Sequence, residues 1–154
     1  MNPYEQKLQQ FLSENGVQAE HLSFDCSCHS VEEAAAAAEA SIDDLVKNIC
    51  MVNSEGKIIV AIVKGESRVS TKRVTKALDN AEIRIATPDE ILEKTGYPCG
   101  GTPSFGFSGI FLIDPKVMEK ETVYTGGGSA SSLTKIQTQE LQRVNRGEII
   151  RVRK

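Results

Sequence analysis

Lys47 is a charged residue within a largely apolar stretch that runs from Leu45 to Val52. If this stretch is a β-strand, the alternation of side chains places Lys47 on one face with Leu45, Ile49 and Met51. An ammonium group among apolar neighbours loses hydration, so either its stem packs at an edge while its head reaches water, or the residue lines a cleft. A lysine in a cleft can hold a phosphate, a sugar oxygen or a developing negative charge.

A second candidate is the glycine-rich segment Thr95–Gly109, which has five glycines and two prolines in fifteen residues. Such a loop can bring backbone N–H groups close to a ligand, because glycine removes side-chain bulk and proline fixes the backbone. The segment matches neither a phosphate-binding P-loop nor a dinucleotide-binding fingerprint. A long structural turn is the alternative, although loops of this length are often functional. The Thr125–Ser129 segment leaves a similar choice between a phosphate-binding nest and a plain turn.

Cys26, Cys28 and His29 place two thiols and an imidazole close together in the sequence. A zinc site usually separates its paired cysteines by about two to four residues, and only the isolated Cys50 and Cys99 could complete the ligand set. Nucleophilic catalysis by a cysteine needs a histidine that is placed in space, which sequence adjacency does not provide. A metal or thiol function is therefore disfavoured, and we expect no metal and no cofactor.

Charge is distributed unevenly along the chain, although the formal net charge is only −3. Residues 1–44 hold nine acidic side chains and one lysine, whereas Lys64–Lys76 holds five basic residues and one glutamate. Arg143–Lys154 also holds five basic residues and one glutamate. These basic segments are either solvated faces or parts of one rim that meets a polyanion. The negative total excludes only a protein that coats nucleic acid non-specifically.

Length and composition predict one globular domain, since the chain has 154 residues, of which 40% are hydrophobic and 25% charged. The N-terminus lacks the basic start and apolar run of a signal peptide, and no segment has the roughly 18 apolar residues of a membrane span. We therefore expect a cytoplasmic protein with reduced cysteines and no membrane partner.

Helix caps and apolar periodicity define the elements that must position these residues. Ser30–Glu33 and Thr87–Glu90 are capping boxes, each of which opens a helix. Other helices are predicted over residues 3–15, 70–78 and 139–144, and strands over residues 17–24, 45–52, 57–63, 83–86, 110–113, 122–125, 133–136 and 148–152. Because no regular βαβ repeat is present, we predict a single α+β domain over residues 1–154, with a mixed, largely antiparallel sheet or barrel and surrounding helices.

Several short motifs stand in the order found in one protein family. They are Glu33-Ala34-Ala35, Leu45-Val46-Lys47, Lys57–Val63, Ala86–Glu90, Thr95-Gly96-Tyr97, Gly100-Gly101 with Phe105-Gly106, Leu112-Ile113-Asp114 and Thr125–Ser129. In combination they resemble the YbaK/ProX aminoacyl-tRNA deacylases, which include free-standing relatives of the editing domain of bacterial prolyl-tRNA synthetase. The resemblance covers roughly residues 20–145.

The resemblance implies a metal-independent enzyme that hydrolyses mischarged aminoacyl-tRNA in trans, removing a small amino acid from the 3′ end. It makes Lys47 a catalytic residue that positions the acceptor end, with Gly100 and Gly101 offering backbone groups to the ester. The substrate-binding residues that it implies are Ser30, Thr102, Pro103, Ser104, Phe105, Gly106, Asp114 and Thr125. The implied partners are the aminoacyl-tRNA acceptor end and a prolyl-tRNA synthetase or another synthetase, and not DNA.

Two positions depart from the family pattern. Ser104 stands where the family loop usually has proline, and Ser30 stands where some members have a bulky aromatic residue. Both differences bear on the choice of amino acid.

The basic segments gain a specific role if the chain holds a tRNA. We expect Arg68, Lys72 and Arg73 to contact tRNA phosphates. The alternative for the whole chain is a non-catalytic tRNA- or nucleotide-binding module of the same fold, which would bind without turnover.

Overall fold

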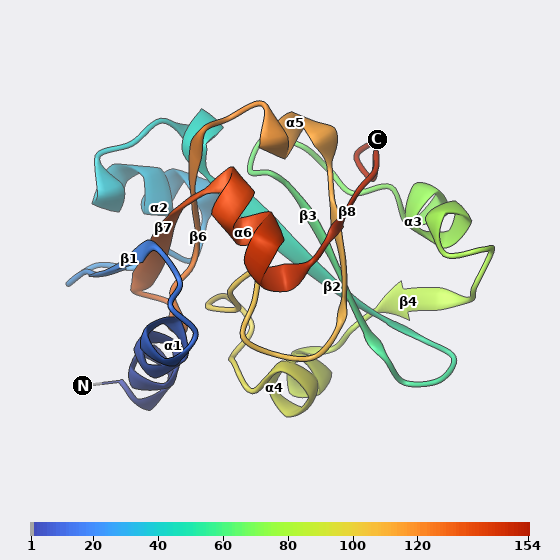
Figure 1. Cartoon of the computed structure of the whole chain (residues 1–154), viewed down its shortest axis with the longest axis horizontal. Coiled ribbons are helices and arrows are strands. Elements are labelled where there is room, and N and C mark those ends of the chain that lie inside the picture. The colour runs from blue at the N-terminus through green and yellow to red at the C-terminus, as the bar shows by residue number, and fades with distance from the viewer. Residues whose placement is uncertain (1) are drawn as a thin grey trace.

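Two β-sheets form the framework of the fold (Figure 1). The computed structural model describes residues 2–154. Its strands are β1 (Ala19–Ser23), β2 (Val46–Asn53), β3 (Ile58–Lys64), β4 (Ile83–Ile85), β5 (Ile110–Ile113), β6 (Thr122–Gly126), β7 (Ser132–Gln137) and β8 (Glu148–Ile149). One sheet has five strands in the order β4-β2-β3-β5-β8, and the other has three in the order β1-β7-β6.

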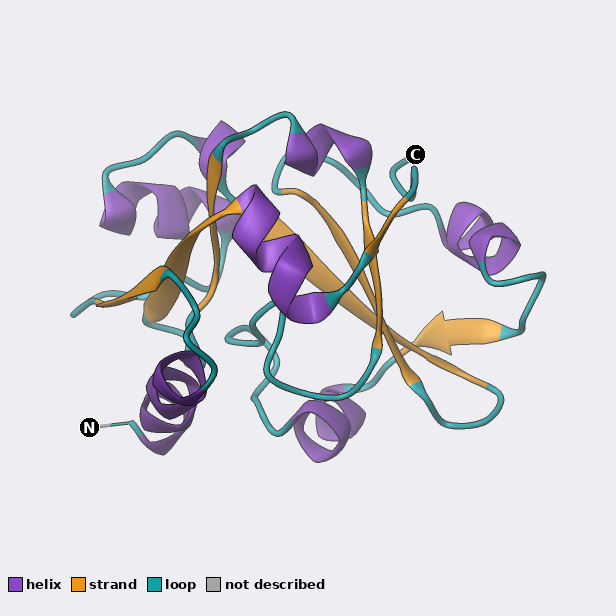
Figure 2. Cartoon of the chain, in the orientation of Figure 1, coloured by secondary structure: helices purple, strands orange, loops and turns teal. Residues whose placement is uncertain are grey.

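Six α-helices and one 3-10 helix surround these sheets within residues 2–154 (Figure 2). They are α1 (Pro3–Glu14), α2 (Val31–Ala38), η1 (Ile42–Asp44), α3 (Thr71–Ala77), α4 (Pro88–Thr95), α5 (Pro115–Met118) and α6 (Thr138–Asn145). In this part of the chain, every helix is too short or too polar to cross a lipid bilayer.

Both predicted capping boxes are present. The Ser30 hydroxyl accepts a hydrogen bond from Glu33 N at 3.0 Å, and Ser30 N donates to the Glu33 carboxylate at 3.2 Å, which starts α2. Thr87 and Glu90 form the same reciprocal pair at the start of α4. Such pairs satisfy backbone N–H groups that the first turn of a helix leaves free, so they fix where these helices begin.

The central strand β3 explains the apolar run that the sequence shows there. Its first six residues are buried, and it lies between β2 and β5 with both faces covered. On one face, Val60 belongs to the same buried cluster as Leu141 of α6, and on the other Ile59 belongs to the same cluster as Val74 of α3. A strand covered on both faces carries a continuous apolar sequence in place of an alternating one.

The strand pairing confirms the α+β class with a mixed, largely antiparallel arrangement, but it separates the strands into two sheets. Strands β3, β5 and β8 pair in parallel, and the other pairs are antiparallel. Within residues 2–154, a parallel bridge between Leu45 and Tyr124 joins the two sheets. The predicted closing strand over residues 148–152 ends at Ile149, because Val152 N instead donates to the Asp114 carboxylate at 3.0 Å.

Candidate functional site

A cleft of about 230 Å³ opens between α2, the start of β2 and the two glycine-rich segments. It is lined by five of the predicted site residues, which are Ser30, Lys47, Gly100, Thr102 and Thr125. Tertiary folding is what brings them together, since they come from widely separated parts of the sequence. The cleft is therefore the candidate site.

The two glycine-rich segments, Thr95–Gly109 and Thr125–Ser129, pack backbone against backbone. Gly128 N donates to Gly101 O at 2.7 Å, and a Cβ atom at position 101 would lie 2.6 Å from Ser129 N, so a side chain does not fit there. The N–H of Gly101 donates to Pro98 O at 3.0 Å and is not free to bind a substrate. The structure thus gives Gly101 a structural role in place of the predicted catalytic one.

Gly100 and Thr102 keep backbone donors for a ligand. Gly100 has a φ of 93°, a left-handed conformation that the turn from Pro98 to Gly101 requires and that glycine adopts without strain. Within residues 2–154, the N–H groups of Gly100 and Thr102 have no hydrogen-bond acceptor. Both residues line the cleft.

Lys47 lies at the cleft with an unpaired ammonium group. Among the described residues it has no carboxylate within ion-pair distance, unlike Lys64 and Lys120, which both pair with Asp43. Burial lowers the pKa of Lys47, and the positive charge of Arg68 lowers it further, while the carboxylate of Glu32 has a smaller opposing effect. An anionic ligand could therefore pair with the Lys47 ammonium group.

Asn48 lines the cleft and bonds three other residues there, although it was not among the residues predicted from the sequence. Its Nδ2 donates to Thr102 O and to Thr125 Oγ1, each at 3.0 Å, and its Oδ1 accepts from Ser104 Oγ at 2.7 Å. The hydroxyl oxygens of Ser104 and Thr125 lie 2.7 Å apart. The alternation that placed Lys47 could have found Asn48, because it puts this amide on the face with buried Val46 and Cys50, where its polar atoms need partners.

Five predicted substrate-binding residues are not on the lining of this cleft, and four of them belong to the segment Thr95–Gly109. Phe105 is 1% exposed and its ring stacks on that of Phe11, with centroids 6.1 Å apart. Gly106 borders a separate cavity beside the same two rings, and Pro103 is buried. Ser104 is fully buried and reaches the cleft only through its bonds to Asn48 and Thr125.

Asp114, predicted to bind substrate, instead anchors the C-terminal segment. Its carboxylate is fully buried, accepts hydrogen bonds from the N–H groups of Lys116, Val152 and Arg153, and pairs with the Arg153 guanidinium at 2.8 Å. Burial by itself raises the pKa of Asp114, but these hydrogen bonds outweigh burial and the net pKa is lowered. These bonds hold residues 152–153 to the start of α5.

Three cysteines and one histidine, Cys28, Cys50, Cys99 and His29, also line the cleft. Burial raises the pKa of Cys28 and raises that of Cys50 to about 12, so neither is a thiolate near neutral pH. Within residues 2–154, no three His, Cys, Asp or Glu side chains are grouped so that they could hold a metal ion. Cys26, Cys28 and His29 thus do not form a ligand set.

The two basic segments meet along residues 68–70 and 152–154, near the C-terminus (Figure 1). Val69 pairs with Arg153, Ser70 N donates to Val152 O at 2.7 Å, and Lys154 N donates to Arg68 O at 2.8 Å. Lys72 and Arg73 are exposed in the first turn of α3, which follows directly. The structure therefore brings the predicted tRNA-binding residues together with the C-terminal segment in one basic rim, and the charge of Arg68 reaches Lys47.

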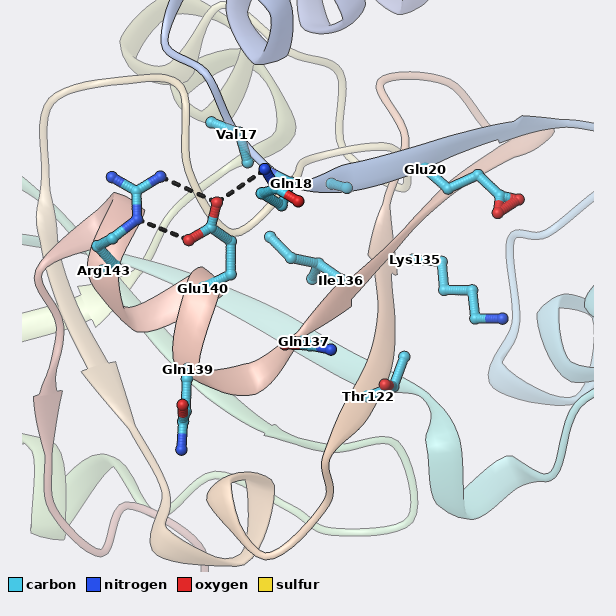
Figure 3. Close-up of a pocket in the computed structure, with 11 residues that line it drawn as sticks. Val17, Gln18, Glu20, Thr122, Lys135, Ile136, Gln137, Gln139, Glu140 and Arg143 are labelled. Carbon is cyan, nitrogen blue, oxygen red and sulfur yellow. Dashed lines mark hydrogen bonds and ion pairs between the residues drawn. The ribbon is translucent and has the colours of Figure 1, made fainter.

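A larger groove of about 830 Å³ lies elsewhere, between β1, β7 and α6 (Figure 3). It contains none of the predicted site residues. Its Glu140 carboxylate is already bound by the Arg143 guanidinium at 2.6 Å and by Gln18 N at 2.7 Å, which lowers the pKa of Glu140 to about 2. Glu140 and Arg143 of this groove pair with each other, whereas the smaller cleft combines a lysine without an ion-pair partner in residues 2–154 with free N–H donors.

Comparison with protein families matches residues 26–144 to the aminoacyl-tRNA editing domain. The chain is 25% identical over 120 residues to the uncharacterized protein YwhH of Bacillus subtilis (strain 168). These aligned residues are 77% of this chain and 76% of that protein. It is 33% identical over 81 residues to the proline–tRNA ligase of Solidesulfovibrio magneticus, but these residues are 52% of this chain and only 14% of that enzyme.

Solved structures show the same fold over the whole chain. A proposed trans-editing enzyme for prolyl tRNA synthetase superposes with a TM-score of 0.90 at 23% identity and covers 100% of this chain and 99% of its own. The hypothetical protein APE2540 superposes with a TM-score of 0.87 at 24% identity, over 96% of this chain and 99% of its own. At these identities the likeness establishes the fold alone.

Proposed function

The chain belongs to the aminoacyl-tRNA editing domain family, and from this premise we propose that it hydrolyses the ester bond of mischarged aminoacyl-tRNA in trans. The observation that carries the proposal is the cleft itself. It combines an unpaired lysine with two free backbone N–H groups in a volume of about 230 Å³. That volume is below the roughly 300–1,000 Å³ of sites for drug-sized ligands, and it suits an aminoacyl group with the ribose at the mouth.

Lys47 and the glycine-rich loop have separate roles in this proposal. The Lys47 ammonium holds a phosphate or ribose oxygen of the terminal nucleotide. The N–H groups of Gly100 and Thr102 bind the ester carbonyl oxygen, where negative charge develops when water attacks the carbon. Removing one such donor from an enzyme typically costs about 100- to 1,000-fold in rate.

The proton of the attacking water also needs an acceptor. The residues that line the cleft include no carboxylate, and the thiols of Cys28 and Cys50 have raised pKa values. The resemblance to the deacylases suggests the 2′-hydroxyl of the terminal adenosine as the group that assists the water. The carbon–oxygen bond to the ribose then breaks, and the 3′-oxygen leaves with a proton, so this route needs no metal.

The test is a deacylation assay on tRNAs charged with alanine, serine, threonine, cysteine or proline. We expect the wild-type protein to hydrolyse at least one of them and Lys47→Ala to lose about 10- to 100-fold in kcat/KM, the loss of one charged contact to the substrate. Lys57→Ala is the matched control, because Lys57 is an exposed lysine in the β2–β3 turn at the opposite end of the hairpin from Lys47. Absence of hydrolysis for every charged tRNA would overturn the proposal.

A second candidate function is binding of tRNA without turnover, which the convergence of the two basic segments favours. In either case the proposed partner is the acceptor end of tRNA. The similarity to part of a proline–tRNA ligase also makes a prolyl-tRNA synthetase, or another synthetase, a candidate partner. Tight tRNA binding without release of the amino acid would select this second function.

A further inference from the structure

Three polar side chains at the cleft, Asn48, Ser104 and Thr125, form a closed ring. Consecutive members are joined by contacts of 2.7 Å (Asn48 to Ser104), 2.7 Å (Ser104 to Thr125) and 3.0 Å (Thr125 to Asn48). Ser104 is fully buried and Thr125 is 1% exposed. Asn48 and Thr125 line the cleft, while Ser104 lies behind them.

The orientation of the Asn48 amide is fixed by a backbone carbonyl. Its Nδ2 lies 3.0 Å from Thr102 O, which can only accept a hydrogen bond. Rotating the amide by half a turn would set Oδ1 against that carbonyl oxygen, with no proton between them. The Asn48 oxygen therefore points to Ser104, and the nitrogen points to Thr102 and Thr125.

This orientation assigns every proton of the ring. Because Asn48 Oδ1 is only an acceptor, the Ser104 hydroxyl donates to it. The contact between Ser104 and Thr125 then requires the Thr125 proton, and the two Asn48 protons go to Thr125 Oγ1 and Thr102 O. All four protons are consumed inside the protein. What remains are lone pairs on Asn48 Oδ1 and Thr125 Oγ1, the ring atoms that belong to cleft-lining residues.

Because the ring has free lone pairs but no free proton, it favours a ligand group that donates a hydrogen bond. The group should also be neutral, because the lining contains no carboxylate to balance a cation and Lys47 already brings a positive charge. A side-chain hydroxyl meets both conditions, whereas a methyl group would leave the ring oxygens without a partner.

Resting on the proposed function, we propose that the Asn48–Ser104–Thr125 ring makes the cleft select aminoacyl groups whose side chain bears a hydroxyl, as in serine and threonine. Ser104 is the positioning residue of the ring. It does not line the cleft, but its hydroxyl holds the Asn48 oxygen and takes up the Thr125 proton. A proline at this position, as in the usual family pattern, has no hydroxyl and would leave the Thr125 proton free.

The experiment compares substrate pairs of similar size that differ in the hydroxyl. The same tRNA is charged separately with each of four amino acids. Seryl-tRNA is compared with alanyl-tRNA, and threonyl-tRNA with valyl-tRNA, whose side chain is isosteric, and kcat/KM is measured for each. We expect the wild-type protein to prefer the hydroxyl member of each pair by at least about 10-fold, since sites that bind a substrate hydroxyl discriminate strongly against analogues that lack it.

Variants of the ring test the assignment of protons. Thr125→Val removes a ring hydroxyl and frees an Asn48 proton, so the preference should fall below about 3-fold, while Thr125→Ser keeps the hydroxyl and should retain it. Ser104→Ala should also reduce the preference, because it frees the Thr125 proton. These ratios compare two substrates on one variant, so a general loss of folded protein does not change them. If Ser104→Ala does not fold, the Thr125 pair still decides.

The outcomes separate this inference from the proposed function. Equal kcat/KM for both members of each pair would overturn the inference and leave the hydrolase intact. If no charged tRNA is hydrolysed, the proposed function fails. The inference is then tested by calorimetric titration with non-hydrolysable 3′-aminoacylamino-adenosine analogues. Tighter binding of the seryl than of the alanyl analogue, lost in Thr125→Val, would support it, and equal binding or no binding would overturn it.

Discussion

At the scale of single residues, Lys47 should contribute to function at a cost in stability. Its ammonium group is partly desolvated, faces the charge of Arg68 and has no ion-pair partner within residues 2–154, so its pKa is lowered. A lowered lysine pKa means that the folded state disfavours the charged form, and removal of the charge relieves this penalty. Lys47→Met should therefore lose about 10- to 100-fold in deacylation without a fall in the thermal midpoint.

Calorimetry beside the deacylation assay checks this prediction. Lys57→Met serves as the matched variant, because Lys57 is exposed and should change neither quantity. A Lys47→Met protein that unfolds several degrees below the wild type would show that Lys47 stabilises the fold.

Asp114 should behave in the opposite way, as a residue of stability and not of substrate binding. Asp114→Asn removes the charge that holds Arg153, and breaking a buried pair costs about 3–5 kcal/mol. Because Arg153 retains some exposure, we expect about 2–3 kcal/mol at pH 7, measured by urea unfolding. The lowered pKa of Asp114 stabilises the fold above the unfolded pKa of about 3.9, and this advantage disappears as the pH falls through the folded value.

The variant and the wild type should consequently converge in stability at acid pH, while kcat/KM at pH 7 stays within about 3-fold of the wild type. A much larger loss of activity in folded Asp114→Asn protein would show that Asp114 takes part in substrate binding or catalysis.

At this scale the sequence singles out a side chain that conflicts with its surroundings, whereas a role transferred with a whole motif depends on partners that the motif does not contain. The apolar neighbours of Lys47 were enough to single it out. Asp114 and Phe105 were assigned to the substrate because they stand in family motifs, but the structure uses the first to hold the C-terminal segment and the second as core. The partners that decide those roles, Arg153 and Phe11, are distant in the sequence and could not be read from it.

At the scale of elements, helix α1 is tied to the second glycine-rich segment by one buried carboxylate. Glu5 is 5% exposed, and its two oxygens accept hydrogen bonds from Ser23 Oγ at 2.6 Å and Ser129 Oγ at 2.8 Å. Ser129 in turn lies 2.8 Å from Ser132, which lines the cleft. We expect Glu5→Gln to destabilise the fold by about 1–3 kcal/mol, since one buried hydroxyl loses its acceptor.

Hydrogen exchange over residues 126–132 measures this tether, and exchange should accelerate there before it does in β3. Glu14→Gln on the same helix is the control, because Glu14 is exposed and bonds only Gln10. Unchanged exchange in this segment would show that the backbone packing around Gly101 holds it without Glu5.

Elements with a local cause could be predicted, and elements with a distant cause could not. The capping boxes at Ser30 and Thr87 placed α2 and α4, because the hydrogen bonds that start these helices lie within four residues. The short helix α5 was missed although Asp114 and Pro115 open it with a cap and a proline. The division into two sheets depends on which strands pair across the chain, and the parallel pairing of β3 with β5 has no local signal.

At the scale of the whole molecule, the net charge of −3 conceals a basic rim. The acidic excess lies within residues 1–44, while the basic segments meet where Val69 pairs with Arg153. Sequence alone left open whether these segments converge, because their contact joins residues far apart along the chain. The positive charge of Arg68 helps to lower the pKa of Lys47, so this end of the rim acts electrostatically on the cleft lysine.

Reversal of charge at Arg68, Lys72 and Arg73 to glutamate should therefore weaken tRNA binding and reduce its dependence on salt. Each lost phosphate contact on a single strand removes about 0.7 from the slope of log affinity against log salt, and on a duplex about 0.9. Loss of three contacts should reduce the slope by about 2 or more, measured by fluorescence titration at several salt concentrations. Reversal of Lys57, Lys94 and Lys135 gives the same net charge away from the rim and should change the slope little, because local contacts and not total charge set it. Equal slopes for the two triple variants would mean that the rim is only a solvated face and that the tRNA reaches the cleft from another side.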